Sequence, residues 1–175
     1  VMLRPEVLGN IQQVHVQEGD WVKKGQLLVE LDPKTYQAAL EQQQANVRMQ
    51  RIAIERQQLE IGRLEQQHAR KQKLFRQNLI DQDSYENFQH SLQVAKVDLR
   101  TRQESLKQAQ AQLQQTEESL HKTRIKSPIA GQVTHLPIKV GETVVASNTS
   151  IAGSMLMTIA DPSTIMAEVF VDEAD

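Results

Sequence analysis

Residues with chemically reactive side chains are scattered through this chain of 175 residues. The five histidines stand at positions 15, 68, 90, 121 and 135, and none forms a close pair supported by carboxylates, as a metal site needs. Cysteine is absent, which excludes disulfides and thiolate ligands. We find no pairing of a nucleophile with a base, no phosphate-binding glycine loop and no paired catalytic carboxylates. We therefore expect a protein that is not an enzyme and that holds neither a metal nor a cofactor.

The composition of the chain limits which partners and what kind of core this protein can have. The formal net charge is -2 and basic residues are interspersed with acids, so we expect no nucleic-acid partner. Only 3% of the residues are aromatic, which favours thin apolar layers over one large core. No apolar run approaches the roughly 18 residues that a membrane-spanning helix requires.

A glycine pattern occurs twice in the chain. In each copy a glycine is followed ten residues later by a second glycine and an acid, and a valine stands three residues after the second glycine. Glycine tolerates the positive φ that tight turns between short strands need. The predicted turn glycines are Gly9, Gly19, Gly25, Gly131 and Gly141. We expect residues 1–33 and 123–161 to be two half-domains that pack face to face as one small sandwich.

The segment 34–122 between the two copies has the composition of a helix. It contains no proline and a single glycine, Gly62. Asp32 followed by Pro33 is typical of a helix start. Asn78 can end a helix in the left-handed conformation, and Asp81 can cap the next one. The sequence therefore predicts two antiparallel helices that meet at a tip at about residues 77–83.

Apolar residues recur at heptad spacing along both predicted helices. Polar residues, His68 among them, interrupt the pattern in the first helix. The predicted seam residues are Leu40, Val47, Ile54, Ile61, Phe75, Tyr85, Phe88, Leu92, Leu99, Leu106, Leu113 and Leu120. We expect a marginal coiled coil that gains stability from lateral neighbours. Each helix, at about 1.5 Å per residue, extends roughly 65 to 70 Å, so we expect the hairpin to hold its tip at a distance.

Three segments together resemble the HlyD-like family of periplasmic adaptors, also called membrane fusion proteins. They are the run from Val16 to Pro33, the long helical insertion, and the run from Ile125 to Val133. The resemblance implies an α+β fold, a split biotinyl-lipoyl-like β-sandwich with a long antiparallel α-helical coiled-coil hairpin inserted between its halves. Residues 162–175 are similar to the family's lead-in to a further β-barrel domain. We therefore expect a fragment of a longer chain.

The resemblance also implies a function in transport. Family members are periplasmic subunits that bridge an inner-membrane transporter to a TolC-type outer-membrane channel, so we expect attachment to the inner membrane through an N-terminal segment outside this fragment. Self-association into a ring, as a hexamer or a trimer of dimers, is implied as well. The chain looks most like adaptors of ABC exporters of the macrolide type. An adaptor of a proton-driven pump, of RND or MFS type, stays an alternative, as does a coiled-coil scaffold without a transport function.

The tip carries a further part of the resemblance. Family members that engage a TolC-type channel carry an arginine, a leucine four residues later and a serine seven residues beyond that. The same spacing gives Arg70, Leu74 and Asp81 here, with aspartate in place of serine. The resemblance implies that these residues contact the channel. Without the resemblance, the residues alone favour the alternative, in which Arg70 lies on a solvated helix face and Leu74 is part of the seam.

A different resemblance leads to the carrier domains of lipoyl and biotin enzymes, whose modified lysine stands in an exposed hairpin between the two halves. The nearest lysine here is Lys34, at the predicted helix start. The second half, with Ser127 and Pro128, follows only after the long insertion. We therefore favour the adaptor over the carrier and expect no attached cofactor.

Overall fold

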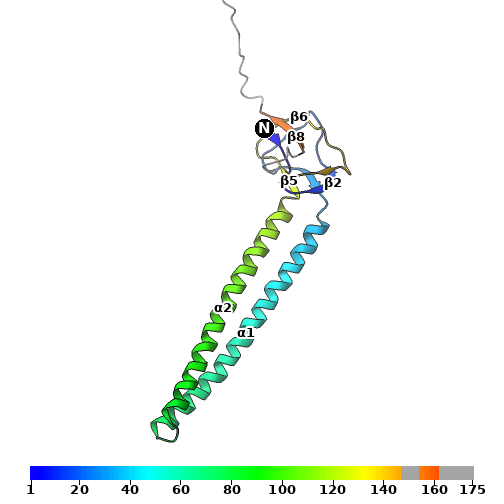
Figure 1. The fold of residues 1–175 in the computed structure, drawn as a ribbon. Helices are drawn as coiled ribbons and strands as arrows, with labels where there is room; N and C mark the ends of the chain where they lie inside the picture. Colours follow the sequence, from blue (N-terminus) through cyan, green and yellow to red (C-terminus); the bar gives the residue numbers. More distant parts are fainter. Residues whose placement is uncertain (147–153, 162–175) are drawn as a thin grey trace, which may run out of the picture. The chain divides into compact units, whose positions relative to one another are not determined.

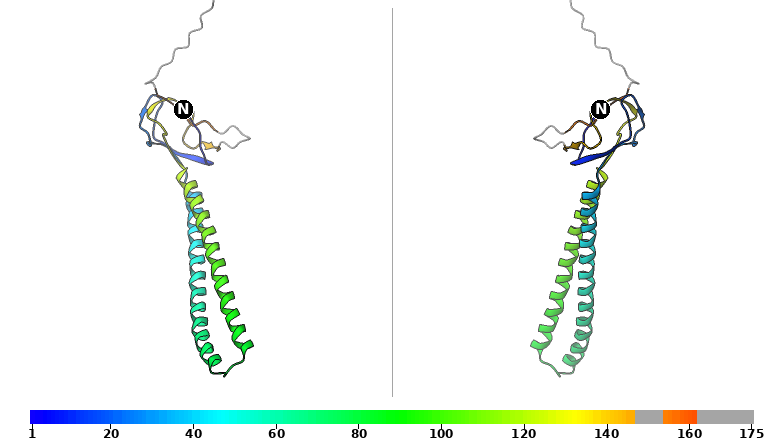
Figure 2. Two further views of the ribbon diagram at one scale, coloured as in Figure 1. Left: turned by 90° about the vertical axis from the view of Figure 1, so that its left-hand side faces the viewer. Right: turned by 90° about the vertical axis from the view of Figure 1, so that its right-hand side faces the viewer.

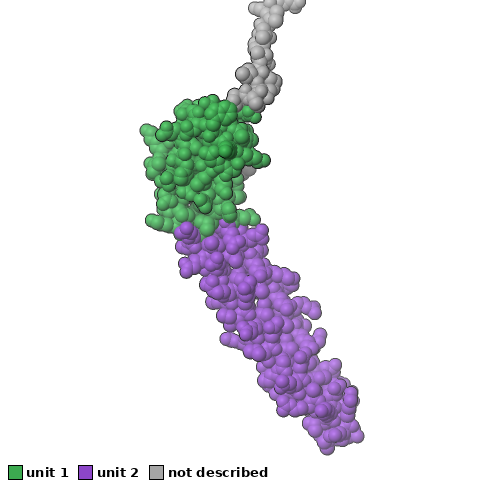
Figure 3. All heavy atoms as spheres, turned by 180° about the vertical axis from the view of Figure 1, so that it is seen from behind, with its two compact units in different colours: residues 1–36, 118–175 green, residues 37–117 purple. Residues whose placement is uncertain are grey.

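A computed structural model describes residues 1–146 and 154–161 of the chain (Figure 1). The predicted lead-in to a β-barrel, residues 162–175, lies outside the described residues. The chain divides into a β unit, residues 1–36 and 118–175, and a hairpin unit, residues 37–117 (Figure 3). The division falls inside the helices, so the first residues of one helix and the last residues of the other belong to the β unit. The Tyr36 hydroxyl donates a hydrogen bond to the Leu8 carbonyl over 2.6 Å, and Lys122 forms an ion pair with Glu6.

Two four-stranded antiparallel sheets form the β unit, in the orders β1-β8-β6-β3 and β5-β4-β2-β7. The strands are β1 (Met2–Leu3), β2 (Gly9–Val14), β3 (Trp21–Val22), β4 (Leu27–Leu31), β5 (Arg124–Lys126), β6 (Gly131–His135), β7 (Thr143–Val144) and β8 (Met157–Ala160). The two copies of the glycine pattern exchange strands, since β3 joins the sheet of β6 and β8 while β7 joins the sheet of β2 and β4. Each copy therefore contributes to both sheets, whereas the sequence predicted that each copy forms one face.

One apolar core joins the two sheets. Side chains from both copies are fully buried in it, including Ile11, Leu28, Val133, Val144 and Ile159. Burial of a side chain of this size contributes about 1.5 to 3 kcal/mol. Because neither copy supplies enough of this surface by itself, the two copies stabilise each other.

The glycines serve two different purposes. Gly19, Gly25 and Gly141 have φ values of 98°, 83° and 89°, so they occupy the predicted turns. Gly9 and Gly131 do not lie in turns, contrary to the prediction, but begin β2 and β6. At Gly131 an added Cβ atom would overlap the carbonyl oxygen of Ala160, so the close approach of β8 excludes a side chain.

Two long helices, α1 (Lys34–Arg76) and α2 (Gln82–His121), lie side by side (Figures 1 and 2), and all but their ends nearest the β unit belong to the hairpin unit. The Asp32 carboxylate accepts a hydrogen bond from the Lys34 amide over 3.1 Å at the start of α1. All the predicted seam residues are buried or half-buried. Polar residues also take part, because the Gln57 amide group donates to the Ala95 carbonyl over 3.0 Å. The paired face of the hairpin therefore follows the heptad positions.

Candidate functional site

The tip of the hairpin is a defined turn. α1 ends in a Schellman motif, in which Asn78 adopts the left-handed conformation with a φ of 56°. The Leu79 amide donates to the Leu74 carbonyl over 2.9 Å, and the Asn78 amide donates to the Phe75 carbonyl over 2.9 Å. These bonds satisfy carbonyl groups that the end of a helix otherwise leaves without partners. The backbone at the tip is therefore fixed by its own hydrogen bonds.

Asp81 caps the second helix. Its Oδ1 atom accepts a hydrogen bond from the Ser84 amide over 3.0 Å, which is the N-cap arrangement. Hydrogen bonds from Ser84 hold the pKa of the Asp81 carboxyl below its usual value, and the positive charge of Lys71 acts in the same direction. Asp81 is exposed. The tip therefore presents a carboxylate to any partner at neutral pH.

A cluster of rings lies directly behind this turn and joins the two helices. Phe75 and Tyr85 are stacked, with centroids 4.9 Å apart and planes inclined by 7°. His68 lies 5.5 Å from Tyr85 and 6.4 Å from Phe88, centroid to centroid. The Tyr85 hydroxyl lies 3.3 Å from Nε2 of His68, and Lys71 Nζ lies 5.0 Å from the centre of the Phe88 ring. Stacked and cation–π contacts of this kind hold the last turns of α1 against the first turns of α2.

The structure places the three predicted contact residues at the same end of the hairpin. Arg70 is exposed, and its side chain forms no ion pair or hydrogen bond with any other residue that the structure describes. The side chain of Leu74 is 39% exposed, although its backbone closes the turn. The carboxylate of Asp81 accepts the capping hydrogen bond from the Ser84 amide. The three residues thus offer a cation, an apolar group and an anion, and no described interaction joins them to each other.

One exposed residue at the tip was missed by sequence reasoning. Leu79 follows the left-handed Asn78, and its side chain is 66% exposed. The sequence could have indicated this residue, because Leu79 is the second residue after the helix end in the Schellman motif. An apolar residue there commonly contacts the helix residue at the position of Leu74. Leu74 and Leu79 together form an apolar patch on the turn, which we name the tip patch.

Other sites that the sequence raised do not assemble in the described residues. Across positions 1–146 and 154–161, no three His, Asp or Glu side chains gather in a way that could hold a metal ion. Lys34 begins α1 and does not stand in a β-hairpin. Among the helices that the structure describes, none is both long and apolar enough to cross a membrane.

The split sandwich and the inserted hairpin define a class of protein. A family model described as the barrel-sandwich hybrid domain of RND membrane fusion proteins matches residues 1–158. The match covers most of the chain, and the chain therefore belongs to this family of membrane fusion proteins.

Individual relatives agree with this family. The chain is 28% identical over 170 residues to the macrolide export protein MacA of Escherichia coli O157:H7, covering 97% of this chain and 45% of the relative. It is 29% identical over 169 residues to the multidrug resistance protein MdtA of Pantoea ananatis (strain AJ13355), covering 97% of this chain and 37% of the relative. The chain thus spans less than half the length of these curated relatives.

Among solved structures, the fold is similar to the crystal structure of MacA from Actinobacillus actinomycetemcomitans. The TM-score is 0.85 at 27% sequence identity, and the match covers 93% of this chain and 50% of the other. This similarity includes the α+β arrangement of a split sandwich with an inserted helical hairpin.

Proposed function

We propose that this chain is the lipoyl-like and hairpin part of a periplasmic adaptor that joins an inner-membrane transporter, of the ABC type, to a TolC-type outer-membrane channel. The chain has no catalytic role in this proposal, and the transporter supplies the energy. The observation that carries the proposal is the tip patch. Leu74 and Leu79 are exposed on a turn that hydrogen bonds and stacked rings hold in one conformation. A fixed apolar patch loses little conformational entropy when a partner covers it.

Arg70 and Asp81 add charge to the tip patch. Arg70 is exposed and has no partner among the described residues, so its guanidinium group is available for a carboxylate or carbonyl of the channel. The capping bond from Ser84 keeps Asp81 ionised. We infer that the adaptor recognises its channel through an apolar centre with one charge of each sign beside it.

The comparisons support two types of transporter, and we propose the ABC type. Similarity in both sequence and fold to the macrolide export proteins supports an ABC exporter. The family model is named for RND membrane fusion proteins and favours the alternative, a proton-driven pump. To distinguish the two, the complete adaptor is co-expressed separately with an ABC transporter and with an RND pump encoded in the same genome, and co-purification of each transporter with the adaptor is measured. Stable capture of only the RND pump would overturn the ABC assignment.

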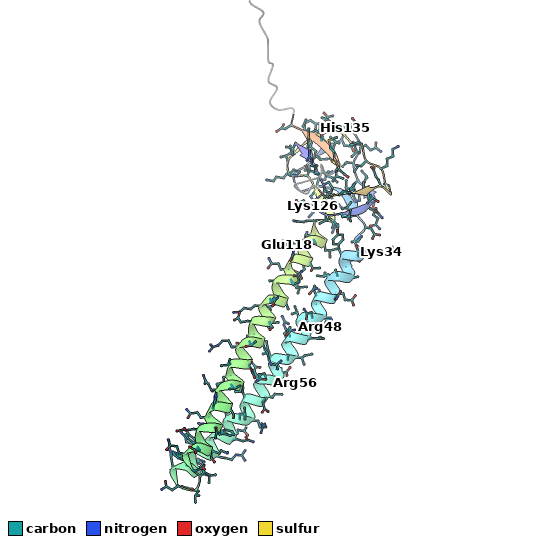
Figure 4. All side chains as sticks on the ribbon, viewed as in Figure 1. Lys34, Arg48, Arg56, Glu118, Lys126 and His135 are labelled. Atoms are coloured by element: carbon teal, nitrogen blue, oxygen red, sulfur yellow. The ribbon has the colours of Figure 1, made fainter. Side chains whose placement is uncertain are left out.

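Self-association into a ring, as a hexamer or a trimer of dimers, is the second part of the proposal. Exposed apolar residues lie opposite the seam on both helices. They are Met49, Ile52 and Leu59 on α1, and Val94 and Val97 on α2. Arg48 and Arg56 mark this stretch of α1 in Figure 4. In an antiparallel pair these two faces point away from each other. One copy can therefore place its α1 face against the α2 face of the next, a head-to-tail contact of the kind that closes rings.

The tip is tested by Arg70→Asp and Leu74→Ser in the complete adaptor. We expect both variants to lose substrate export and chemical crosslinking to the channel, because each removes a contact made only with the partner. Circular dichroism should stay that of a helical hairpin, since both side chains are exposed. Lys139→Asp, an equally exposed position in the β unit, gives a matched change of charge and should keep both activities. Full export and crosslinking in both tip variants would favour the coiled-coil scaffold.

A further inference from the structure

A cavity with a strongly cationic lining lies in the β unit. Its volume is about 450 Å³, and five cationic or protonatable side chains line it, namely Arg4, His121, Lys122, Arg124 and Lys126. Arg4 follows β1, and Arg124 and Lys126 belong to β5. Lys126 is labelled in Figure 4. β1 and β5 are edge strands of different sheets, so the cavity lies at an open edge of the sandwich. It is separate from the hairpin tip, and its interpretation does not rest on the proposed function.

Two of these cations already have acidic partners. Lys122 Nζ lies 2.8 Å from Glu6 Oε2, and Arg124 Nε lies 3.2 Å from Glu30 Oε1. Glu6 raises the pKa of Lys122 through this hydrogen bond, so Lys122 remains charged at neutral pH. Glu6 is the one acid among the residues that line the cavity.

The remaining charge is not neutralised. Arg4 and Lys126 are exposed, and neither side chain forms an ion pair or hydrogen bond with another residue that the structure describes. Two strong cations on one cavity attract an anion, because their mutual repulsion falls when it binds. The lining also includes Met2 and Pro128, which supply apolar surface beside the charges.

These cations could instead have a structural purpose, which is to keep an edge strand from pairing with other chains. Charged side chains on an edge strand prevent pairing with other chains, and this accounts for Arg124 and Lys126, which flank the buried Ile125 on β5. It does not account for Arg4, which comes from the other sheet and lines the same cavity. Cations from both sheets line this one cavity together with the apolar side chains of Met2 and Pro128, a combination that suits a ligand with an anionic group and an apolar body.

We propose that this cavity binds a small amphipathic anion, that is, a phosphate or carboxylate group attached to an apolar body. Arg4 and Lys126 bind the anionic group through charge-assisted hydrogen bonds, and Met2 and Pro128 contact the apolar body. The anion is either a free solute or the head group of a lipid, and the two sources share the same chemistry at the site.

The probe is octyl phosphate, below its micelle concentration, added to the isotope-labelled 175-residue chain. We expect NMR shifts confined to residues 2–6 and 121–128. Inorganic phosphate and octyl glucoside, which each lack one half of the ligand, should bind more weakly. The double variant Arg4→Gln, Lys126→Gln should weaken octyl phosphate binding by about tenfold or more. The matched control is Lys23→Gln, Lys24→Gln, an equal loss of charge in the exposed β3–β4 turn, and it should leave the affinity unchanged.

Several results would overturn the proposal. Equal weakening in the control pair would mean that only the overall charge matters. Equal binding of inorganic phosphate would remove the apolar part of the ligand, and equal binding of octyl glucoside would remove the anionic part. Dispersed NMR spectra of both double variants check that they are folded. Sedimentation with vesicles of phosphatidic acid, compared with vesicles of phosphatidylcholine, distinguishes the two sources of the anion. If the chain binds phosphatidic acid vesicles and the binding depends on Arg4 and Lys126, the ligand is a lipid head group. If it binds octyl phosphate but not these vesicles, the ligand is a free solute.

Discussion

The amide of Gly19 donates a hydrogen bond of 2.8 Å to the carbonyl of Val133, across the whole helical insertion. A reciprocal bond of 2.8 Å runs from the Gly141 amide to the Ile11 carbonyl. Residues 19 and 141 hold the same place in the two copies of the glycine pattern, as do 11 and 133. The two copies are therefore related by an approximate twofold arrangement, in which each turn pairs with the first strand of the other copy.

This arrangement predicts that the β unit folds without the hairpin. Deletion of residues 37–117, with a short glycine-containing turn joining residues 36 and 118, should leave a folded domain, because the core residues and the reciprocal bonds all lie outside the deletion. Dispersed amide signals in an NMR spectrum would show this. A collapsed spectrum would mean that the hairpin is needed to bring the two copies together.

The stack of Phe75 on Tyr85 predicts a stability effect at the tip. Phe75→Ala should lower the unfolding free energy of the hairpin by about 1 to 3 kcal/mol, since a half-buried ring loses both its burial and its stacking partner. Phe75→Leu keeps most of the apolar volume, so its loss should be smaller. Thermal unfolding followed by helical circular dichroism measures both. If both variants melt like the parent chain, the ring cluster does not hold the helices together.

Asp81 predicts a dependence on pH. Its carboxyl has a pKa in the folded chain below the ordinary value of 3.8, so the cap contributes stability that is fully present above that value and is lost as the pH falls through the lower, folded-state pKa. Protection of the Ser84 amide from hydrogen exchange should therefore decrease in that acidic range. In Asp81→Ser, which keeps a capping oxygen but no charge, this decrease should be smaller. Identical pH profiles for the two proteins would exclude the charged cap as the cause.

We expect substitutions of Gly62 to stabilise the helix, and we expect a long side chain there to weaken the assembly of copies. A Cβ atom added there meets nothing within 4 Å, so Gly62→Ala should stabilise the helix by about 1 kcal/mol. Gly62→Gln also favours helix but places a long side chain one turn from Leu59, which is 72% exposed on the face that we propose for a neighbouring copy.

The chain has no cysteine, so this assembly is open to disulfide crosslinking. A variant with Leu59→Cys and Val97→Cys should form covalent oligomers in the complete adaptor, and adding Gly62→Gln should reduce their yield. The variant Leu59→Cys, Glu117→Cys, with the second cysteine at a distant level of the hairpin, serves as the control. Equal yields with and without Gly62→Gln would place Gly62 outside the interface between copies.

Much of the hairpin could be predicted because its determinants are local. The N-cap at Asp32, the left-handed Asn78 and the cap at Asp81 each act on backbone groups within a few residues, so residue types alone give the helix ends. Heptad spacing gives the paired faces for the same reason, because helical geometry converts a sequence interval into a direction. The sequence could also establish that the two glycine patterns belong together, since neither can bury enough apolar surface by itself.

Tertiary structure decided the rest. The exchange of β3 and β7 between sheets depends on hydrogen bonds between residues far apart in the sequence, and two-residue strands carry no periodicity that reveals a partner. Gly131 is a glycine because β8 passes close to it, a requirement that no local pattern contains. His68 interrupts the heptad pattern, yet it packs between Tyr85 and Phe88, because contact between rings depends on the register of two helices. Local interactions therefore fix where the two helices begin and end, whereas contacts between distant residues decide how the strands are paired and which elements meet.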